Sequence, residues 1–304
     1  MSSSQGVPKP IRVGDYDVQS SAIGSGTQGQ VMKAVHVPTG QSVALKVYPL
    51  DTPVGKRGFL NEVNAFAILK NRAGVLQAQK SFQWEEAKGV IVMELMDCDL
   101  LAVLTHQRPD EDATVRLFHS ICVGAYNMHQ VHLAHLDIKP ENILLNADGL
   151  PVVCDFGASV EYKSGKKYRG RRGTPGYTCP EMAFEQPFSP EAADVWSLGI
   201  LLHVMLTGFF PYDACEADCT QQFSPEQFST LYRQNRKLSY QAISLLNFML
   251  VEDGDKRPSM SQVMQHSFFD VSVVPETSNP TETITSKLRR AVRPRLWAPF
   301  TKSH

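Results

Sequence analysis

The chain has 304 residues, of which 42% are apolar and 20% are charged, and its formal net charge is −1. This composition can form a packed core, and the length favours two domains or one large domain with two lobes. Because the net charge is close to zero, it argues against a nucleic-acid-binding protein and against binding to an anionic membrane.

Residues 1–15 are rich in Ser, Pro and Gly, and we expect them to form a flexible leader. Met1–Pro10 has neither the basic region nor the apolar region of a signal peptide. Ser2 stands where myristoylation requires Gly. The six cysteines form no CxxC pair. We therefore expect an intracellular, cytoplasmic protein with no membrane anchor.

Residues 16–96 are predicted to form a small lobe made mostly of strands. Runs of β-branched and apolar residues predict strands over Tyr16–Ile23, Gln30–His36, Ser42–Tyr48 and Val90–Met96. Phe59–Leu69 has apolar residues at helical spacing and is predicted to be a helix.

Residues 97–271 are predicted to form a larger lobe made mostly of helices. Apolar periodicity predicts helices over 113–131, 190–207, 226–236 and 239–250. The most apolar stretch, Val195–Leu206, is too short to span a bilayer, so we interpret it as a buried core helix. A small β-rich lobe therefore precedes a larger α-rich lobe.

A glycine-rich segment follows the first predicted strand. Gly24, Gly26 and Gly29 form the pattern GxGxxGxV, which ends at Val31. Glycines let a loop bring its backbone N–H groups close to phosphate. A dinucleotide-binding loop leads into a helix, whereas a predicted strand over Gln30–His36 follows here. The pattern favours a flap over nucleotide phosphates, and a glycine-rich hairpin without a ligand is the alternative.

A lysine lies inside the third predicted strand. Lys46 follows three apolar residues, and a lysine in such a position is costly unless an opposite charge pairs with it. Glu62 is the one acidic residue between Asp51 and Glu85, and it lies in the predicted helix. Lys46 and Glu62 are therefore a candidate ion pair at nucleotide phosphates. Two solvated surface charges are the alternative.

Two further motifs contain the remaining candidate catalytic residues. His135–Asn142 reads HLDIKPEN and precedes a predicted strand over Ile143–Leu145. Asp155–Gly157 reads DFG and follows a predicted strand over Val152–Cys154.

In order and spacing, all of these motifs resemble those of the eukaryotic protein kinase family. The resemblance covers about residues 16–270 and includes Cys179–Glu181, Asp194–Gly199 and the pair Arg257-Pro258. It implies an α+β bilobal kinase fold, with one main helix in the small lobe and an ATP cleft between the lobes. The positions of Lys139 and Thr174 resemble the serine/threonine branch, which implies an enzyme that phosphorylates Ser and Thr hydroxyls of proteins.

The resemblance also implies a role for each candidate residue. Asp137 would be the catalytic base, and Lys139 would neutralise the γ-phosphate of ATP. Asn142 and Asp155 would bind Mg²⁺ through oxygen atoms. Thr174 would bridge Asp137 and Lys139. The residues implied in ATP binding are Gly24, Gly26, Gly29, Val31, Ala44, Lys46, Glu94, Met96, Asp99 and Leu144.

Other matching positions imply scaffold roles. Glu181 and Arg257 would form a buried ion pair, and Asp194 would bind the backbone of the catalytic loop. Leu136 stands where the family has an Arg that pairs with a phosphate on the activation segment. Because a leucine cannot do this, we hypothesise that phosphorylation of this segment is not the main on-switch.

Three histidines recur at every third position, which is compatible with a metal-binding face. We instead interpret His129 and His132 as the end of a helix and His135 as part of the catalytic loop.

Two basic segments stand out from the near-neutral whole. Tyr162–Arg172 carries six Lys or Arg and no acid, which predicts either a platform for acidic or phosphorylated substrates or a solvated loop. Glu141 points the other way, since family members with an acid there often prefer basic substrates. The tail over 272–304 is basic from residue 280 onward and is either a docking segment for a partner or a disordered terminus.

Two other functions are alternatives to an active protein kinase. A pseudokinase scaffold without turnover is disfavoured because the chain retains Lys46, Glu62, Asp137, Asn142 and Asp155. A small-molecule phosphotransferase is disfavoured because Gly173–Glu181 resembles a peptide-substrate platform.

Overall fold

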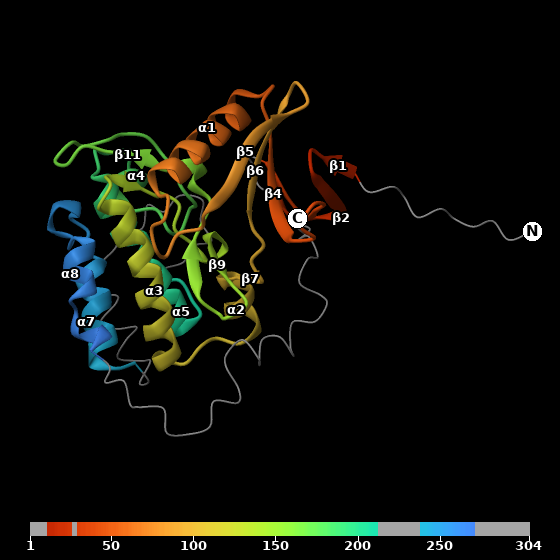
Figure 1. Ribbon diagram of the computed structural model, residues 1–304. Coiled ribbons are helices and arrows are strands. Elements are labelled where there is room, and N and C mark those ends of the chain that lie inside the picture. Colours follow the sequence, from red (N-terminus) through yellow and green to blue (C-terminus); the bar gives the residue numbers. More distant parts are fainter. Residues whose placement is uncertain (1–10, 26–28, 212–237, 271–304) are drawn as a thin grey trace, which may run out of the picture. The chain divides into compact units, whose positions relative to one another are not determined.

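The structure is a computed structural model, and it describes residues 11–25, 29–211 and 238–270 (Figure 1). Outside these ranges lie Gly26, the predicted helix over 226–236 and the basic tail over 272–304. The described residues form two compact units. The smaller unit contains residues 11–66 and 77–95, and the larger unit contains the others.

The smaller unit consists of a six-stranded antiparallel sheet and one long helix. The strands are β1 (Ile11–Val13), β2 (Tyr16–Ser25), β3 (Gln30–His36), β4 (Ser42–Pro49), β5 (Ala78–Trp84) and β6 (Lys88–Glu94). Their order in the sheet is β1-β2-β3-β4-β6-β5. The helix is α1 (Pro53–Ile68). The predicted strand over Gln30–His36 is confirmed with the same bounds.

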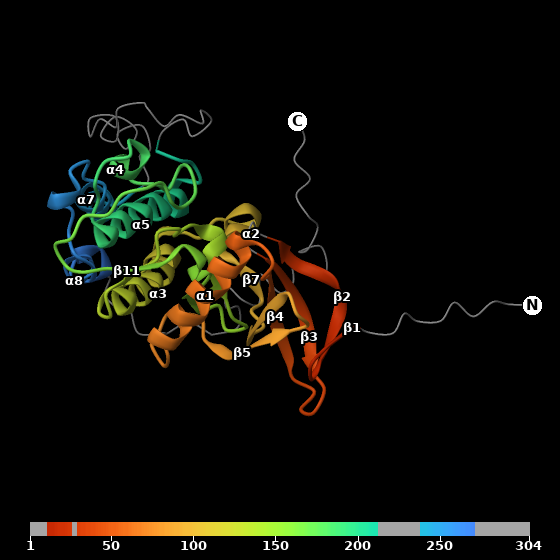
Figure 2. The ribbon, with the colours of Figure 1, turned by 90° about the horizontal axis from the view of Figure 1, so that it is seen from above.

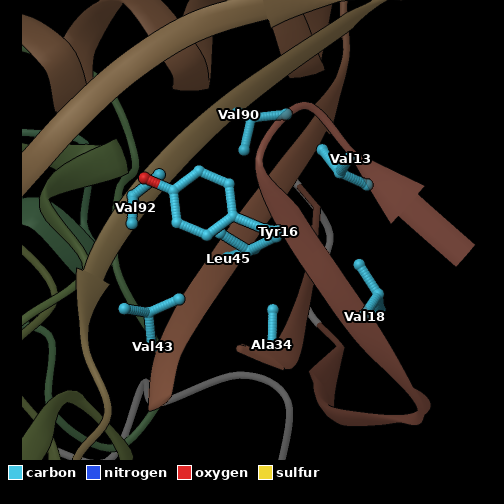
Figure 3. Packing of buried hydrophobic residues seen from close by; sticks show 8 residues of the cluster. All are labelled: Val13, Tyr16, Val18, Ala34, Val43, Leu45, Val90 and Val92. Atoms are coloured by element: carbon cyan, nitrogen blue, oxygen red, sulfur yellow. The ribbon is translucent and has the colours of Figure 1, made fainter. Parts of the chain in front are cut away.

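One face of this sheet forms a hydrophobic core. Alternate residues of a strand point to the same face, so Val43 and Leu45 of β4 lie with Val90 and Val92 of β6. Figure 3 shows the buried members of this cluster, which are Val13, Tyr16, Val18, Ala34, Val43, Leu45, Val90 and Val92. The aromatic rings of Phe82 and Trp84 pack against it.

The prediction of a flexible leader over residues 1–15 is wrong at residues 11–13, which form β1. Gly14 adopts a φ of 58°, and the turn at this residue pairs Val13 with Tyr16. The Val13 side chain is fully buried, so its apolar contacts hold this short strand on the sheet. A three-residue strand is too short to produce a recognisable alternation.

Helix α1 begins at Pro53 and not at the predicted Phe59. The Thr52 hydroxyl accepts a hydrogen bond from the Gly55 N–H at 3.1 Å, which caps the helix before its apolar periodicity begins. Proline suits the first helical position because the N–H that it lacks would have no partner within the helix.

The larger unit is mostly helical. Its helices are α2 (Leu100–His106), α3 (Glu111–His129), α4 (Pro180–Ala183), α5 (Pro190–Thr207), α7 (Tyr240–Met249) and α8 (Met260–Met264). Its strands are β7 (Cys98–Asp99), β8 (Leu133–Ala134), β9 (Ile143–Leu145), β10 (Pro151–Val153) and β11 (Val160–Glu161). Short 3₁₀ turns span Pro140–Asn142, Phe156–Ala158, Gly254–Lys256 and Ser267–Phe269. These elements, with the β-rich smaller unit, confirm the predicted α+β fold.

Helix α5 is the centre of the larger unit and has the predicted bounds. It is apolar on all sides and is almost completely buried, as its sequence requires. It ends at Gly208, which takes the left-handed conformation with φ 82°. Figures 1 and 2 show α3 and α5 side by side. Of the helices that the structure describes, none combines the length and apolarity needed to cross a membrane.

The segment 67–76 belongs to the larger unit, although the sequence placed it in the small lobe. Gly74 accepts a hydrogen bond from Val153 N–H at 2.9 Å, and Leu76 donates one to Val153 at the same distance. Asn127 of α3 also donates to the Ala73 carbonyl at 2.9 Å. These bonds attach the segment to β10 and α3.

Truncating the core of the smaller unit should strongly destabilise the protein. Leu45 is fully buried, so we expect Leu45→Ala to lower the free energy of unfolding by about 2–5 kcal/mol. Leu60 of α1 is 55% exposed, and Leu60→Ala is the matched control, with an expected change below about 0.5 kcal/mol. Urea unfolding followed by circular dichroism and tryptophan fluorescence measures both. Equal losses in the two variants would contradict this core assignment.

Candidate active site

The loop that carries Asp137 is held by a buried carboxylate of α5. Asp194 is 1% exposed and accepts hydrogen bonds from the backbone N–H groups of His135 and Leu136, each at 2.8 Å. Nε2 of His129, the last residue of α3, lies 2.9 Å from the same carboxylate. Because a carboxylate only accepts, this ring nitrogen donates. The predicted bond between Asp194 and the loop backbone is present.

Leu136 takes the left-handed backbone conformation, with φ 62°. This conformation is rare for a residue with a bulky side chain and costs of the order of 1–3 kcal/mol. The bond from its N–H to Asp194 holds it there. The Leu136 side chain is only 4% exposed, so it is buried at the position where the resemblance expected an exposed phosphate-binding arginine.

Three polar side chains surround the Asp137 carboxylate. The Thr174 hydroxyl donates to Oδ1 of Asp137 at 2.7 Å, and Lys139 Nζ donates to the Thr174 oxygen at 2.6 Å. Lys139 Nζ also lies 3.2 Å from Oδ2 of Asp137. Asn142 donates through Nδ2 to the same Oδ2 at 3.1 Å. The predicted bridge by Thr174 is therefore present, and the sequence did not predict the bond from Asn142.

The DFG segment is bonded to this loop. His135 lies with Nε2 2.9 Å from the Cys154 carbonyl oxygen, and Cys154 donates its N–H to the Asn142 carbonyl oxygen at 2.9 Å. Asp155 follows in the left-handed conformation with φ 63°. The backbone bond between Cys154 and Asn142 brings the predicted metal ligands Asn142 and Asp155 into neighbouring positions.

The donor atoms at this place fit Mg²⁺. Since Nδ2 of Asn142 donates to both the backbone and the side chain of Asp137, its Oδ1 atom points away from that residue. An amide oxygen and a carboxylate are the hard ligands that Mg²⁺ prefers. The two predicted ligands are one Asn and one Asp. No group of three or more His, Cys, Asp or Glu that could hold a metal ion occurs in the described part of the chain.

The smaller unit contains a buried ion pair of its own. Lys46 of β4 and Glu62 of α1 lie 2.7 Å apart, with side chains 10% and 1% exposed. The Lys46 ammonium also lies 5.2 Å from the centre of the Tyr48 ring. The predicted pair is present, and the alternative of two solvated surface charges is wrong.

The predicted ATP-binding residues of the sheet share one face. Val31 is paired with Lys46, and Ala44 with Met93, so all four side chains lie on the face opposite the hydrophobic core. Gly29 comes just before β3, where a side chain would collide with the Val47 carbonyl. Elsewhere in the unit, Gly24 pairs with Val31 and Glu94 ends β6.

The remaining predicted ATP-binding residues lie in the larger unit. Asp99 of β7 is paired with Leu144 of β9, and Met96 is buried. The Asp99 carboxylate accepts the Ala102 N–H at 2.7 Å and caps α2. Burial raises the pKa of this carboxyl, and the bond from Ala102 partly opposes that shift. The structure thus assigns Asp99 a structural role, and its implied part in ATP binding stays a prediction.

A second buried ion pair supports the region after Thr174. Arg257 lies with one guanidinium nitrogen 2.6 Å from the Glu181 carboxylate, and its side chain is fully buried. Its guanidinium group also stacks on the Trp196 ring, 4.9 Å from the ring centre. The predicted pair of Glu181 and Arg257 is therefore present.

Sequence reasoning missed the role of His129. Its spacing from His132 and His135 suggested only a metal face or a helix end, whereas its bond to Asp194 joins residues 65 positions apart. Nothing in the local pattern indicates a partner at that separation.

Comparisons with known proteins agree with this arrangement. Residues 18–269 match the family described as "Protein kinase domain". Human serine/threonine-protein kinase D3 is 32% identical over 80% of this chain and 28% of its own length. Mitogen-activated protein kinase kinase 3 of Arabidopsis thaliana is 30% identical over 81% of this chain and 48% of its own. Chicken (Gallus gallus) serine/threonine-protein kinase SIK2 is 28% identical over 86% of this chain and 32% of its own. The chain thus spans less than half the length of these relatives.

A double-mutant cycle should show that Lys46 and Glu62 are strongly coupled. We expect the stabilities of Lys46→Met, Glu62→Gln and the double variant to give a coupling of about 2–3 kcal/mol. The exposed pair of Lys88 and Glu85, 3.1 Å apart in the same unit, is the control. Its coupling, measured with Lys88→Met and Glu85→Gln, should be less than about 1 kcal/mol. Equal coupling in the two pairs would contradict the buried pairing.

Proposed function

The chain belongs to the protein kinase domain family, and on this premise we propose that it transfers the γ-phosphate of ATP to Ser and Thr hydroxyls of proteins. The names of its relatives, two of which are called serine/threonine-protein kinases, support this substrate class. The single observation that carries the proposal is the bonded cluster of Asp137, Thr174 and Lys139.

In this proposal, Asp137 orients the acceptor hydroxyl and takes its proton. Phosphoryl transfer depends mainly on positioning and charge neutralisation, so a carboxylate in a defined orientation is the main requirement. The bonds from Thr174 and Asn142 hold the two carboxylate oxygens of Asp137 in place. The Lys139 ammonium, 3.2 Å from Asp137, neutralises negative charge on the transferred phosphoryl group.

Mg²⁺ and the remaining residues would prepare ATP for transfer. When bound, Mg²⁺ supplies positive charge to the phosphates, and Asn142 and Asp155 would hold it. Lys46, fixed by Glu62, would bind the α- and β-phosphates, and the loop from Gly24 to Gly29 would cover them.

Phosphoryl transfer from radiolabelled MgATP to casein or myelin basic protein tests the proposal. We expect Asp137→Ala to lower kcat by about 10²–10⁴-fold, which is the usual contribution of a positioned acid or base. Asp148 lies in the exposed turn between β9 and β10, and Asp148→Ala is the matched control that should retain activity. If the wild-type protein binds ATP but transfers no phosphate, the chain is a pseudokinase scaffold. If Asp137→Ala remains active, the assigned base is wrong.

A further inference from the structure

The segment Lys163–Arg172 is strongly basic, and little of its charge is compensated. It contains six Lys or Arg, all exposed, and no acid. Of these six cations, only Lys167 forms an ion pair with a residue that the structure describes, namely Asp255. Arg169 and Arg172 instead donate to the carbonyls of Glu185 and Ala158, which carry no net charge. Within the described chain, five cations of this segment therefore have no carboxylate partner.

The backbone of the segment follows a defined path. Tyr168 and Phe188 exchange two backbone hydrogen bonds, at 2.8 and 2.9 Å. The Lys163 N–H also donates to the Tyr168 hydroxyl at 3.2 Å. These bonds hold the backbone at Lys163 and Tyr168, so less of the segment has to be ordered when an anion binds.

The end of the segment lies close to the candidate catalytic base. Thr174 is bonded to Asp137, and a side chain at Gly173 would collide with the Leu136 carbonyl. Arg171 is three residues before Thr174, so the two Cα atoms are at most about 11 Å apart. A peptide whose hydroxyl reaches Asp137 can therefore bring residues a few positions away within reach of Arg171 and Arg172.

We propose that Arg171 and Arg172 select substrates that carry carboxylate or phosphate groups close to the acceptor hydroxyl. Since an extended peptide advances about 3.3 Å per residue, we expect the anionic groups about two to four residues from the acceptor. Arg171 is exposed and has no bond to the described residues, and Arg172 uses one of its five N–H donors. The planar guanidinium group can bind both oxygens of a carboxylate or phosphate. This inference rests on the proposed kinase activity.

Glu141 is the charge that opposes this preference. It is exposed and lies in the 3₁₀ turn after Lys139. A single carboxylate is outnumbered by the two arginines and by the lysines that precede them, so the anion preference should prevail. Glu141→Gln should strengthen it.

The test compares three peptides with one central serine and flanks of Ala and Gly, of Asp and Glu, or of phosphoserine. The readout is the ratio of kcat/KM for each anionic peptide to that for the neutral peptide. We expect a wild-type ratio on the order of ten, which falls as salt is added because exposed charges are screened. Arg171→Glu/Arg172→Glu should lower the ratio by about tenfold. Comparing the Asp and Glu peptide with the phosphoserine peptide shows whether the protein prefers carboxylate or phosphate groups.

Arg116→Glu is the control for a change in net charge, which it lowers by two units, half the change in Arg171→Glu/Arg172→Glu. Arg116 is exposed on α3, thirteen residues and about 20 Å along the helix from His129. Because this distance exceeds the screening length at physiological salt, the ratio should stay within about twofold of the wild-type value. An equal fall in this control would mean that net charge, and not the two arginines, sets the preference.

Equilibrium binding separates this inference from the proposed function. Fluorescence anisotropy of labelled peptides needs no turnover, so it reports the anion preference even if the protein transfers no phosphate. Preferential binding of the anionic peptides that Arg171→Glu/Arg172→Glu abolishes supports the inference. Equal binding and equal kcat/KM for all three peptides, or a preference for a basic peptide, would overturn it while leaving kinase activity intact.

Discussion

The arrangement of the catalytic loop depends on one buried carboxylate. Asp194 lies on α5, the most completely buried helix that the structure describes, and its charge is satisfied by two backbone N–H groups and one imidazole N–H. A buried charge is costly without such bonds. The same bonds hold Leu136 in a conformation that a leucine rarely adopts. The core of the larger unit therefore stabilises the strained turn on which Asp137 is displayed.

This constraint extends to the residues around Asp137. Once the backbone at Leu136 is fixed, Asp137 lies where Thr174 and Asn142 donate to its carboxylate. His135, whose N–H is bonded to Asp194, connects through its ring to the carbonyl just before Asp155. One carboxylate thus orders the candidate base and the backbone that precedes a candidate metal ligand. The smaller unit has its own buried charge pair, Lys46 and Glu62, whose charged groups lie 2.7 Å apart.

The sequence predicted the long, strongly patterned elements well. Helix α5 and strand β3 have the predicted bounds because continuous apolarity and β-branched residues favour one structure over the full element. The pairs of Lys46 with Glu62 and Glu181 with Arg257 were predicted from isolated charges and from the family resemblance. For Lys46 a charge in an apolar strand pointed to its partner, whereas the pair of Glu181 and Arg257 was implied by the resemblance alone.

The features that the sequence did not predict depend on contacts between distant residues. Strand β1 is stabilised by burial of Val13 in a sheet that must first form. The bond between His129 and Asp194 and the left-handed conformation of Leu136 arise from packing of α3 and the loop against α5. The resemblance implied a role for Asp99 in ATP binding, but the sequence did not predict the cap that its carboxylate forms at the start of α2. Local patterns contain no information about such partners.

Hydrogen exchange at the single amides of His135 and Leu136 is the most direct test of the role of Asp194. In the wild-type protein these two N–H groups should be protected. Asp194→Asn leaves one acceptor oxygen for the two groups, so it should accelerate the exchange of at least one of them by about tenfold or more, because an unsatisfied buried group costs about 1–3 kcal/mol. The amides of α7 (Tyr240–Met249) should exchange as before, which would show that the global fold is retained. Unchanged protection of His135 and Leu136 in Asp194→Asn would contradict the account.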